Sequence, residues 1–214
     1  MLNMGKFITL EGSEGAGKTT QLENIKDYLN QQGIEVVCTR EPGGTPIAEK
    51  IREVLLDKEN SSLCSDAELL LMFAARSQHL NELIIPALNA GKWVICDRFT
   101  DASFAYQGAA RGLSFERIKQ LKLWVQGELD PDITLLFDLP VDVGMARANK
   151  RGPSDRFEQE ALDFFEKVRQ GYLYLAKVEP DRFVIIDAEL TEQQVSIQVE
   201  NSIADFVQNK LTNK

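Results

Sequence analysis

A glycine-rich segment near the start of the chain narrows the choice of fold sharply. Residues 12–19 read Gly-Ser-Glu-Gly-Ala-Gly-Lys-Thr, which fits the pattern G-x-x-x-x-G-K-[ST]. An apolar, strand-like run at residues 7–10 precedes this segment, and a stretch of helical period follows it. In a strand–loop–helix unit of this kind, the glycines let successive N–H groups and the positive helix end point at phosphates. The segment therefore predicts a P-loop that binds a nucleoside triphosphate.

The residues of this loop have different expected roles. Lys18 is expected to reach the β- and γ-phosphates, and the Thr19 hydroxyl is expected to ligate Mg²⁺. The predicted phosphate site consists of Gly12, Ser13, Glu14, Gly15, Ala16, Gly17, Lys18, Thr19 and Thr20. Regulatory GTPases, motor ATPases and small-molecule kinases all share the motif, so it does not identify the reaction. A GTPase is disfavoured, because residues 149–152 (Asn-Lys-Arg-Gly) lack the aspartate of the guanine-reading segment N-K-x-D.

The rest of the chain alternates short apolar runs with longer stretches of helical period, which is the pattern of βαβ units. Several runs are almost continuously apolar, as strands buried on both faces should be. We therefore predict a three-layer P-loop NTPase fold of the α/β class, with a five-stranded parallel sheet covered by helices on both faces. Its 214 residues suit one domain, residues 1–214, since no repeat or linker divides them. The predicted strands are residues 6–11, 34–38, 92–97, 133–138 and 183–187.

Local signals predict where several helices begin and end. A helix over residues 18–32 should stop at Gly33, which adopts the left-handed cap conformation easily. Thr45-Pro46 predicts a helix start, and Thr191 with Gln194 forms a candidate capping box. Pro86 lies inside a helical run over residues 66–89, so a kink or a break is expected there.

The charge and hydropathy patterns bear on partners and location. A formal net charge of −9 argues against non-specific binding to nucleic acid or to anionic lipid. The chain has no apolar run near the roughly 18 residues that span a bilayer, and residues 1–6 lead directly into the first strand. We therefore expect a cytoplasmic protein with no nucleic-acid or membrane partner. An anionic ligand must meet a local cluster of arginines.

A second candidate site element follows the third predicted strand. The apolar residues 93–96 end in Asp97 and Arg98, which should emerge at the carboxyl edge of the sheet, where ligands of open α/β sheets bind. There Asp97 could belong to the Mg²⁺ environment and Arg98 could hold a phosphate. A structural ion pair explains the two residues equally well in isolation, but the P-loop nearby favours the functional interpretation.

Four segments together resemble one family. They are E-G-S-E-G-A-G-K-T at residues 11–19, T-R-E-P-G-G at 39–44, D-R-F at 97–99 and A-Y-Q-G at 105–108. In this order and spacing the chain resembles the thymidylate kinases from residue 7 to about residue 187. The resemblance implies transfer of the γ-phosphoryl group of ATP, with Mg²⁺, to thymidine monophosphate (dTMP) in dTTP synthesis. It also implies a homodimer.

The family's acceptor-binding roles can be carried over to matching positions. The resemblance implies that Arg98 and Arg52 hold the 5′-phosphate, that Glu14 lies near the acceptor sugar, and that Tyr106 lies under the deoxyribose. The implied set of acceptor-binding residues is Arg40, Glu41, Arg52, Phe73, Arg76, Arg98, Ser103, Tyr106 and Gln107, with Arg76 and Gln107 on the thymine edge. Members often carry a base-stacking phenylalanine where this chain has Met72, with Phe73 beside it, so the stacking residue stays open.

Residues 147–158 form a basic segment containing Gly and Pro. Composition alone predicts a solvated loop, whereas the resemblance implies a lid that closes over ATP. Members without a basic residue at the position of Gly15 tend to supply the catalytic arginine from the lid, which indicates Arg151 and Arg156, with Arg147 behind them. The expected catalytic residues are Lys18, Arg98, Arg151, Arg156 and Glu14.

No general base is expected, because a monophosphate acceptor is already largely ionised near pH 7. The single histidine, His79, lies on a helix without a nucleophile pattern, and we interpret it as a surface or packing residue. Two alternatives remain from the sequence. One is a kinase of the same fold that acts on a different monophosphate, and the other is a P-loop switch or binding module that transfers no phosphoryl group.

Overall fold

The computed structural model describes residues 5–150 and 155–212. Within these residues the chain builds one sheet of five parallel strands in the order β2-β3-β1-β4-β5. The strands are β1 (Phe7–Gly12), β2 (Val36–Arg40), β3 (Trp93–Asp97), β4 (Ile133–Asp138) and β5 (Phe183–Asp187). The predicted fold class is confirmed. Four strands lie within one residue of their predicted bounds, and β2 begins two residues later than predicted.

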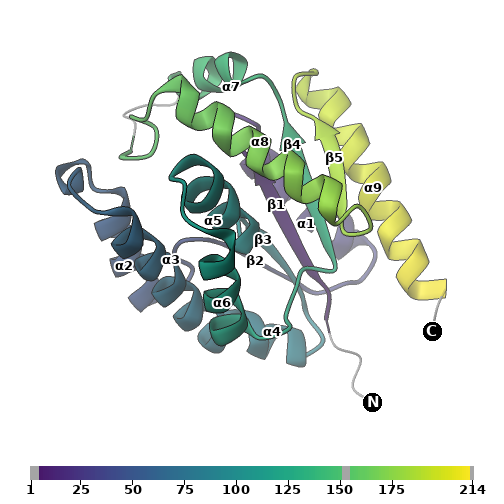
Figure 1. The fold of residues 1–214 in the computed structure, drawn as a ribbon. Coiled ribbons are helices and arrows are strands. Elements are labelled where there is room, and N and C mark those ends of the chain that lie inside the picture. The colour runs from purple at the N-terminus through teal and green to yellow at the C-terminus, as the bar shows by residue number, and fades with distance from the viewer. Residues whose placement is uncertain (1–4, 151–154, 213–214) are drawn as a thin grey trace.

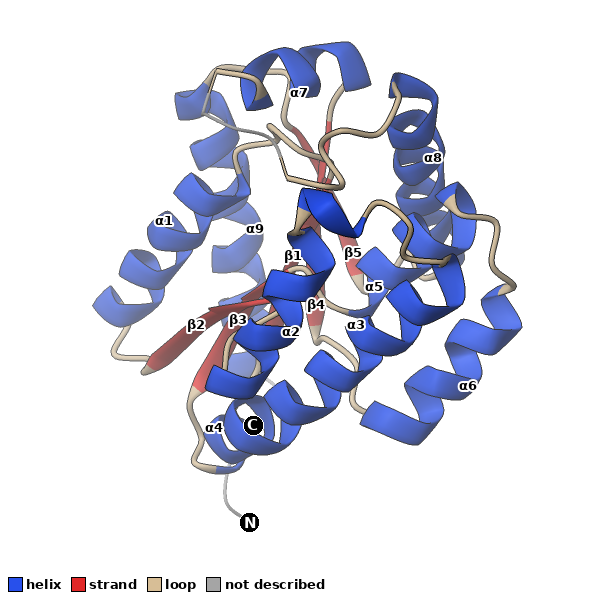
Figure 2. Cartoon of the chain, turned by 90° about the vertical axis from the view of Figure 1, so that its left-hand side faces the viewer, coloured by secondary structure: helices blue, strands red, loops and turns tan. Residues whose placement is uncertain are grey.

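Helices cover both faces of the sheet (Figures 1 and 2). Alternate strand residues point to opposite faces, so Ile8 and Leu10 of β1 pack into one core and Phe7 into another. The first core includes side chains of α1 (Lys18–Gln31) and α9 (Glu192–Thr212). The opposite face is covered by α3 (Ser65–His79), α6 (Phe115–Gln126) and α8 (Leu162–Val178). The protein therefore has the three expected layers.

Shorter elements complete the described chain. The region between β2 and α3 contains α2 (Pro46–Leu56) and the short 3-10 helix Lys58–Asn60. The π-helical segment Leu80–Ile84 joins α3 to α4 (Ile85–Asn89). After β3 come α5 (Thr100–Ser103) and a second π-helical segment, Phe104–Ala110, and α7 (Val141–Ala148) follows β4.

The strand register brings distant polar residues to one edge of the sheet. Asp97, the last residue of β3, lies opposite Leu10 of β1 and Arg40 of β2. Gly12, where the P-loop begins, lies opposite Phe137 near the end of β4. Because the strands are parallel, every strand delivers its following loop to this edge.

The local helix signals are confirmed. Gly33 follows α1 with φ 73°, and Pro46 is the first residue of α2. The Thr191 Oγ1 atom accepts from the N–H of Gln194 at 3.4 Å, while Gln194 Oε1 accepts from the N–H of Thr191 at 3.2 Å. These reciprocal bonds are those of a capping box.

Pro86 neither breaks the helical run nor ends it. The π-helical turn Leu80–Ile84 immediately precedes α4, and the Ile85 N–H donates to the Leu80 carbonyl five residues earlier. The wider turn accommodates the proline ring, which would collide with the preceding carbonyl in a regular α-helix.

Across the part of the chain described, no helix reaches the length and apolar character needed to cross a membrane.

Candidate active site

A cavity of about 510 Å³ lies at the carboxyl edge of the sheet. It is formed by the P-loop, the ends of β2 and β3, and the helices α2, α3 and α5 with the segment Phe104–Ala110. The predicted residues that line it are Glu14, Gly15, Ala16, Gly17, Lys18, Thr19, Thr20, Arg40, Glu41, Arg52, Arg76, Asp97, Arg98, Ser103, Tyr106, Gln107 and Arg147. The fold therefore brings most of the candidate residues to a single cavity.

The P-loop adopts backbone conformations that require glycine. Gly12, Gly15 and Gly17 have φ values of 136°, 73° and 82°, which residues with a Cβ rarely adopt. Lys18 folds back over the loop and donates to the carbonyls of Gly12 (3.0 Å) and Ser13 (2.9 Å). Burial, followed by repulsion from Arg98, lowers the pKa of Lys18 to about 8. Phosphate oxygens at this position would favour the charged ammonium group.

The P-loop packs closely against α7. A Cβ on Gly15 would lie 2.0 Å from the Gly144 carbonyl oxygen, and a Cβ on Gly144 would lie 2.6 Å from the Glu14 carbonyl oxygen. A basic side chain at position 15 is therefore excluded unless α7 moves. The same helix carries Arg147, which lines the cavity and donates to the carbonyls of Ala188 and Glu189.

Arg98 lies between the P-loop and the acceptor side of the cavity. It has a left-handed backbone conformation, with φ 68°, directly after β3. Its guanidinium donates to the Gly12 carbonyl at 2.8 Å, pairs with the Glu14 carboxylate, and lies 5.0 Å from the centre of the Tyr106 ring. Glu14 Oε1 also accepts from the Tyr106 hydroxyl at 3.4 Å. Three predicted site residues are thus in direct contact.

Two further residues hold this part of the site and were missed by sequence reasoning. Glu11 is fully buried, and its two carboxylate oxygens accept from the Phe99 N–H and the Tyr172 hydroxyl, each at 2.7 Å. Tyr172, on α8, also accepts from Arg98 at 3.3 Å. Burial, and then the charge of Asp101, raise the pKa of Glu11 to about 8.

Asp97 carries a buried carboxylate oxygen that is available to a ligand of the cavity. Its Oδ1 atom is buried and has no hydrogen-bond partner within residues 5–150 and 155–212. Asp97 and Thr19 both line the cavity. Among the residues described, no group of three or more His, Cys, Asp or Glu side chains could hold a metal ion. Mg²⁺ usually keeps several waters and binds through one or two protein oxygens and substrate phosphates, so these two residues suit it.

Two further arginines, Arg40 and Arg52, line the same cavity. Arg52 donates to the Pro42 carbonyl at 2.7 Å and makes no ion pair with any described residue. Burial, and then the neighbouring charge of Arg40, lower the pKa of Arg52. Arg40 is more exposed and is paired with Glu49. This local excess of positive charge would be relieved by an anionic ligand.

Arg76 is buried and lines the cavity. Its Nε donates to Glu41 at 2.7 Å, its Nη1 to Ser103 at 3.1 Å and its Nη2 to the Phe99 carbonyl at 3.1 Å. One N–H on each terminal nitrogen remains for a ligand. The Nδ1 atom of His79 lies 3.1 Å from the second oxygen of Glu41, and His79 is fully buried. His79 is therefore a packing residue, not a surface residue.

Four predicted residues do not line the cavity, and a fifth lies outside the described residues. Gly12 and Ser13 are two of the four, and their carbonyls accept from Lys18. Phe73 packs in the core with its ring 4.6 Å from the Arg76 guanidinium carbon, whereas Met72 lines the cavity. Arg156 is buried and does not line the cavity, because its guanidinium is held by the Leu55 carbonyl (2.7 Å) and by Glu68 (2.8 Å). Arg151 lies outside the described residues.

Comparisons with known proteins agree with this geometry. The family model described as thymidylate kinase matches residues 10–199. The chain belongs to the thymidylate kinase family. The thymidylate kinase of Ectopseudomonas mendocina is 59% identical over 92% of this chain and 93% of that protein. The thymidylate kinase of Pseudomonas entomophila is 61% identical over 86% of this chain and 88% of that protein.

A solved thymidylate kinase has the same fold. The crystal structure of thymidylate kinase from Ehrlichia chaffeensis matches with a TM-score of 0.76 and 34% sequence identity, over 95% of this chain and 99% of that one.

Proposed function

We propose that this protein transfers the γ-phosphoryl group of ATP to dTMP, giving ADP and thymidine diphosphate. The observation that carries the proposal is the continuity of one cavity from the P-loop to the buried edge formed by Arg76 and Gln107, with Arg98 between the two ends. Membership of the thymidylate kinase family supports the same reaction. Thymidine diphosphate formed in this way serves dTTP synthesis.

The donor end binds the triphosphate of ATP. The P-loop N–H groups and Lys18 bind the β- and γ-phosphates. Thr19 and Asp97 would hold Mg²⁺, which would supply positive charge beside the phosphates. The terminal P–O bond to ADP breaks as an acceptor phosphate oxygen forms a new P–O bond, so the protein mainly aligns the groups and stabilises charge.

The acceptor end fixes the monophosphate. Arg98 and Arg52 hold its 5′-phosphate, and Arg40 and Glu41 complete that wall. Because the phosphate oxygen is already ionised near pH 7, it needs no general base. Tyr106 lies under the deoxyribose, and Met72 at the cavity surface supports the base in place of Phe73.

We propose one catalytic domain over residues 1–214, with a lid at about residues 147–158. Arg147 already lines the cavity. Arg151 and Arg156 stay candidates for neutralising the transferred group, but Arg156 would first have to leave its two present partners, Leu55 and Glu68.

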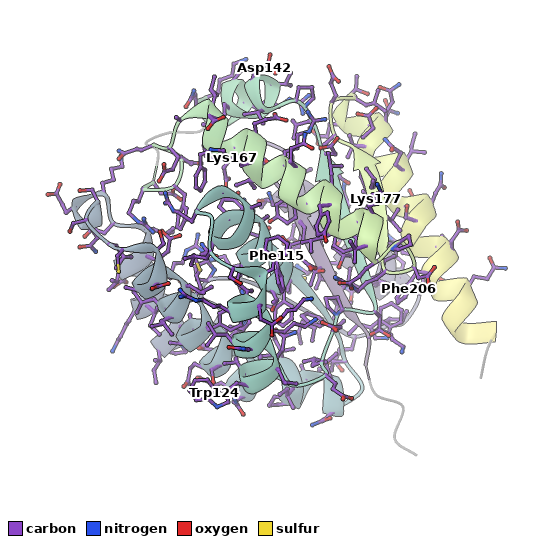
Figure 3. The ribbon with its side chains drawn as sticks, in the orientation of Figure 1. Phe115, Trp124, Asp142, Lys167, Lys177 and Phe206 are labelled. Atoms are coloured by element: carbon purple, nitrogen blue, oxygen red, sulfur yellow. The ribbon has the colours of Figure 1, made fainter. Side chains whose placement is uncertain are left out.

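A homodimer is supported by exposed apolar side chains on α3 and α6, which pack side by side. Leu70, Leu123 and Trp124 have exposed fractions of 56%, 67% and 82%. Figure 3 shows Trp124 at the outer edge of the molecule. Exposed apolar side chains mark a subunit interface where they join into one patch. We also propose a cytoplasmic location, where the two nucleotide substrates are available.

The function is tested by coupled ADP release with a panel of acceptors. Thymidine, deoxyuridine, deoxycytidine, adenosine and guanosine monophosphates are each supplied with ATP and Mg²⁺. We expect the highest kcat/KM with dTMP, and a loss of at least about 10²-fold in Lys18→Ala, which removes a charge that contacts the phosphates. Preference for another monophosphate would indicate a different kinase of this fold. Slow ATP hydrolysis that no acceptor changes would indicate a switch.

A further inference from the structure

Glu68 is a buried carboxylate that joins three parts of the chain. It lies in the first turn of α3 and is 1% exposed. It accepts from Gln107 Nε2 at 2.9 Å, from Arg156 Nη2 at 2.8 Å and from Arg111 Nη2 at 3.3 Å. Glu68 does not line the cavity, but Gln107 does. Its contact with the ligand site is therefore indirect and runs through Gln107.

The chemistry of this contact fixes the orientation of the Gln107 amide. An ionised carboxylate can only accept hydrogen bonds, whereas a glutamine amide has a donor end and an acceptor end. Two arginines, which can only donate, also bond to Glu68, so both of its oxygens serve as acceptors in this cluster. The donor end of Gln107 must therefore face Glu68. The carbonyl oxygen Oε1 is then the end that Gln107 offers to a ligand.

Arg76, which also lines the cavity, offers a hydrogen-bond donor instead of an acceptor. Arg76 can only donate hydrogen bonds. Each of its two terminal nitrogens bonds to one described residue and has a second N–H for a ligand. The base site therefore presents a donor beside an acceptor. Thymine matches this pair, because it has a carbonyl oxygen at O4 and a ring N–H at N3. Cytosine has the reversed pair, an amino group at C4 and an unprotonated N3.

We propose that Glu68 is a specificity-determining positioning residue, which holds Gln107 in the orientation that accepts a thymine or uracil ring and rejects a cytosine ring. The proposal rests on the proposed function, since it assigns the base end of that site. If the proposal is correct, the protein rejects cytosine only when the side chain at position 68 can accept hydrogen bonds but not donate them. Thymine and uracil share O4 and N3–H, so the side chain at position 68 should not affect the discrimination between these two bases.

The test compares acceptor selectivity in Glu68→Gln and Glu68→Asp. Glutamine at position 68 offers a donor and an acceptor, so the Gln107 amide can take either orientation. We expect the ratio of kcat/KM for dTMP to that for deoxycytidine monophosphate to fall by at least about tenfold in Glu68→Gln, mainly through the KM for dTMP. The ratio for dTMP to deoxyuridine monophosphate should stay within about twofold. Glu68→Asp, which keeps a carboxylate, should retain both ratios.

Two controls separate positioning from general loss of structure. Asp138→Asn neutralises another arginine-paired carboxylate, held by Arg169 and absent from the cavity lining. It should lower the thermal midpoint without changing either ratio. Gln107→Leu removes the group that contacts the base and should lose the discrimination against cytosine, so the inference can still be refuted if Glu68→Gln does not fold.

An unchanged dTMP to deoxycytidine monophosphate ratio in folded Glu68→Gln, or in Gln107→Leu, would overturn the inference. A parallel fall in both ratios would also overturn it, because that result indicates a distorted site. Failure of the wild-type protein to phosphorylate dTMP would instead refute the proposed function, and it is measured separately.

Discussion

The pKa of Lys18 should make nucleotide binding depend on pH. Its side chain is buried against two carbonyl groups, and burial with the charge of Arg98 lowers its pKa to about 8. Bound phosphates should raise this pKa, so the complex binds more protons than the free protein at pH values above about 8. ATP affinity should therefore weaken as pH rises, by about tenfold between pH 7 and pH 9. Calorimetric titration with ATP at the two pH values measures this change.

Lys18→Arg is the matched control, because arginine stays charged over this range. Its affinity should be lower overall but much less dependent on pH. Any dependence that remains arises from other titrating groups, which include the terminal phosphate of ATP. Equal pH dependence in the wild type and Lys18→Arg would contradict the assignment to Lys18.

The site residues that the sequence alone predicts are those whose roles depend on neighbours along the chain. The P-loop, Asp97 with Arg98, and the segment around Tyr106 and Gln107 all follow a strand or open a helix, and the fold brings them together. Glu11 and Glu68 could not be identified in this way. Glu11 bonds to a residue 161 positions away, and Glu68 to one 88 positions away. From the neighbouring sequence alone, Glu11 is the end of a predicted strand and Glu68 is an acidic residue in the first turn of a helix.

The choice between Met72 and Phe73 had a different origin. Successive residues of a helix differ by about 100° in direction, so the sequence alone did not determine which of the two faces the cavity. Packing decides this, because Phe73 lies in the core under Arg76.

Among the secondary-structure elements, α7 has an unusually close contact with the P-loop. Gly15 and Gly144 meet backbone to backbone, and a Cβ on Gly144 would lie 2.6 Å from the Glu14 carbonyl. Gly144→Ala should therefore displace α7 and Arg147 from the phosphate end. We expect the KM for ATP to rise at least about tenfold while the KM for dTMP changes little, because the base end is built from α3 and Phe104–Ala110. Steady-state kinetics with each substrate varied in turn measures the two KM values. Equal changes in both KM values would show that α7 has no specific role at the ATP end of the cavity.

The main elements were predictable because their signals are strong and local. Apolar runs identified the strands, and Gly33, Pro46 and the Thr191–Gln194 pair identified helix boundaries. The π-helical turns were not predictable, since no residue pattern distinguishes a wide turn from a regular one. At Pro86 the sequence predicted a kink or a break, and the structure has a π-helical turn before the proline instead.

For the whole molecule, the apolar surface on α3 and α6 predicts self-association. Trp124→Glu should weaken the dimer at least about tenfold, because a two-fold interface would place the substitution twice in a buried patch. Sedimentation equilibrium measures the dissociation constant. Ile197→Glu is the matched control, because Ile197 is 52% exposed on α9, on the other side of the sheet, and should not affect association. Loss of association in both variants, or in neither, would contradict the proposed interface.

The direction of the strands has a practical consequence for handling the protein. The first strand begins, and the last helix ends, near the amino ends of the strands (Figure 1), whereas the cavity residues follow the carboxyl ends of β1, β2 and β3. A tether attached at either end of the chain would therefore hold the protein with its cavity facing away from a solid support. Immobilised preparations made through either terminus should present the same open side to nucleotides in solution.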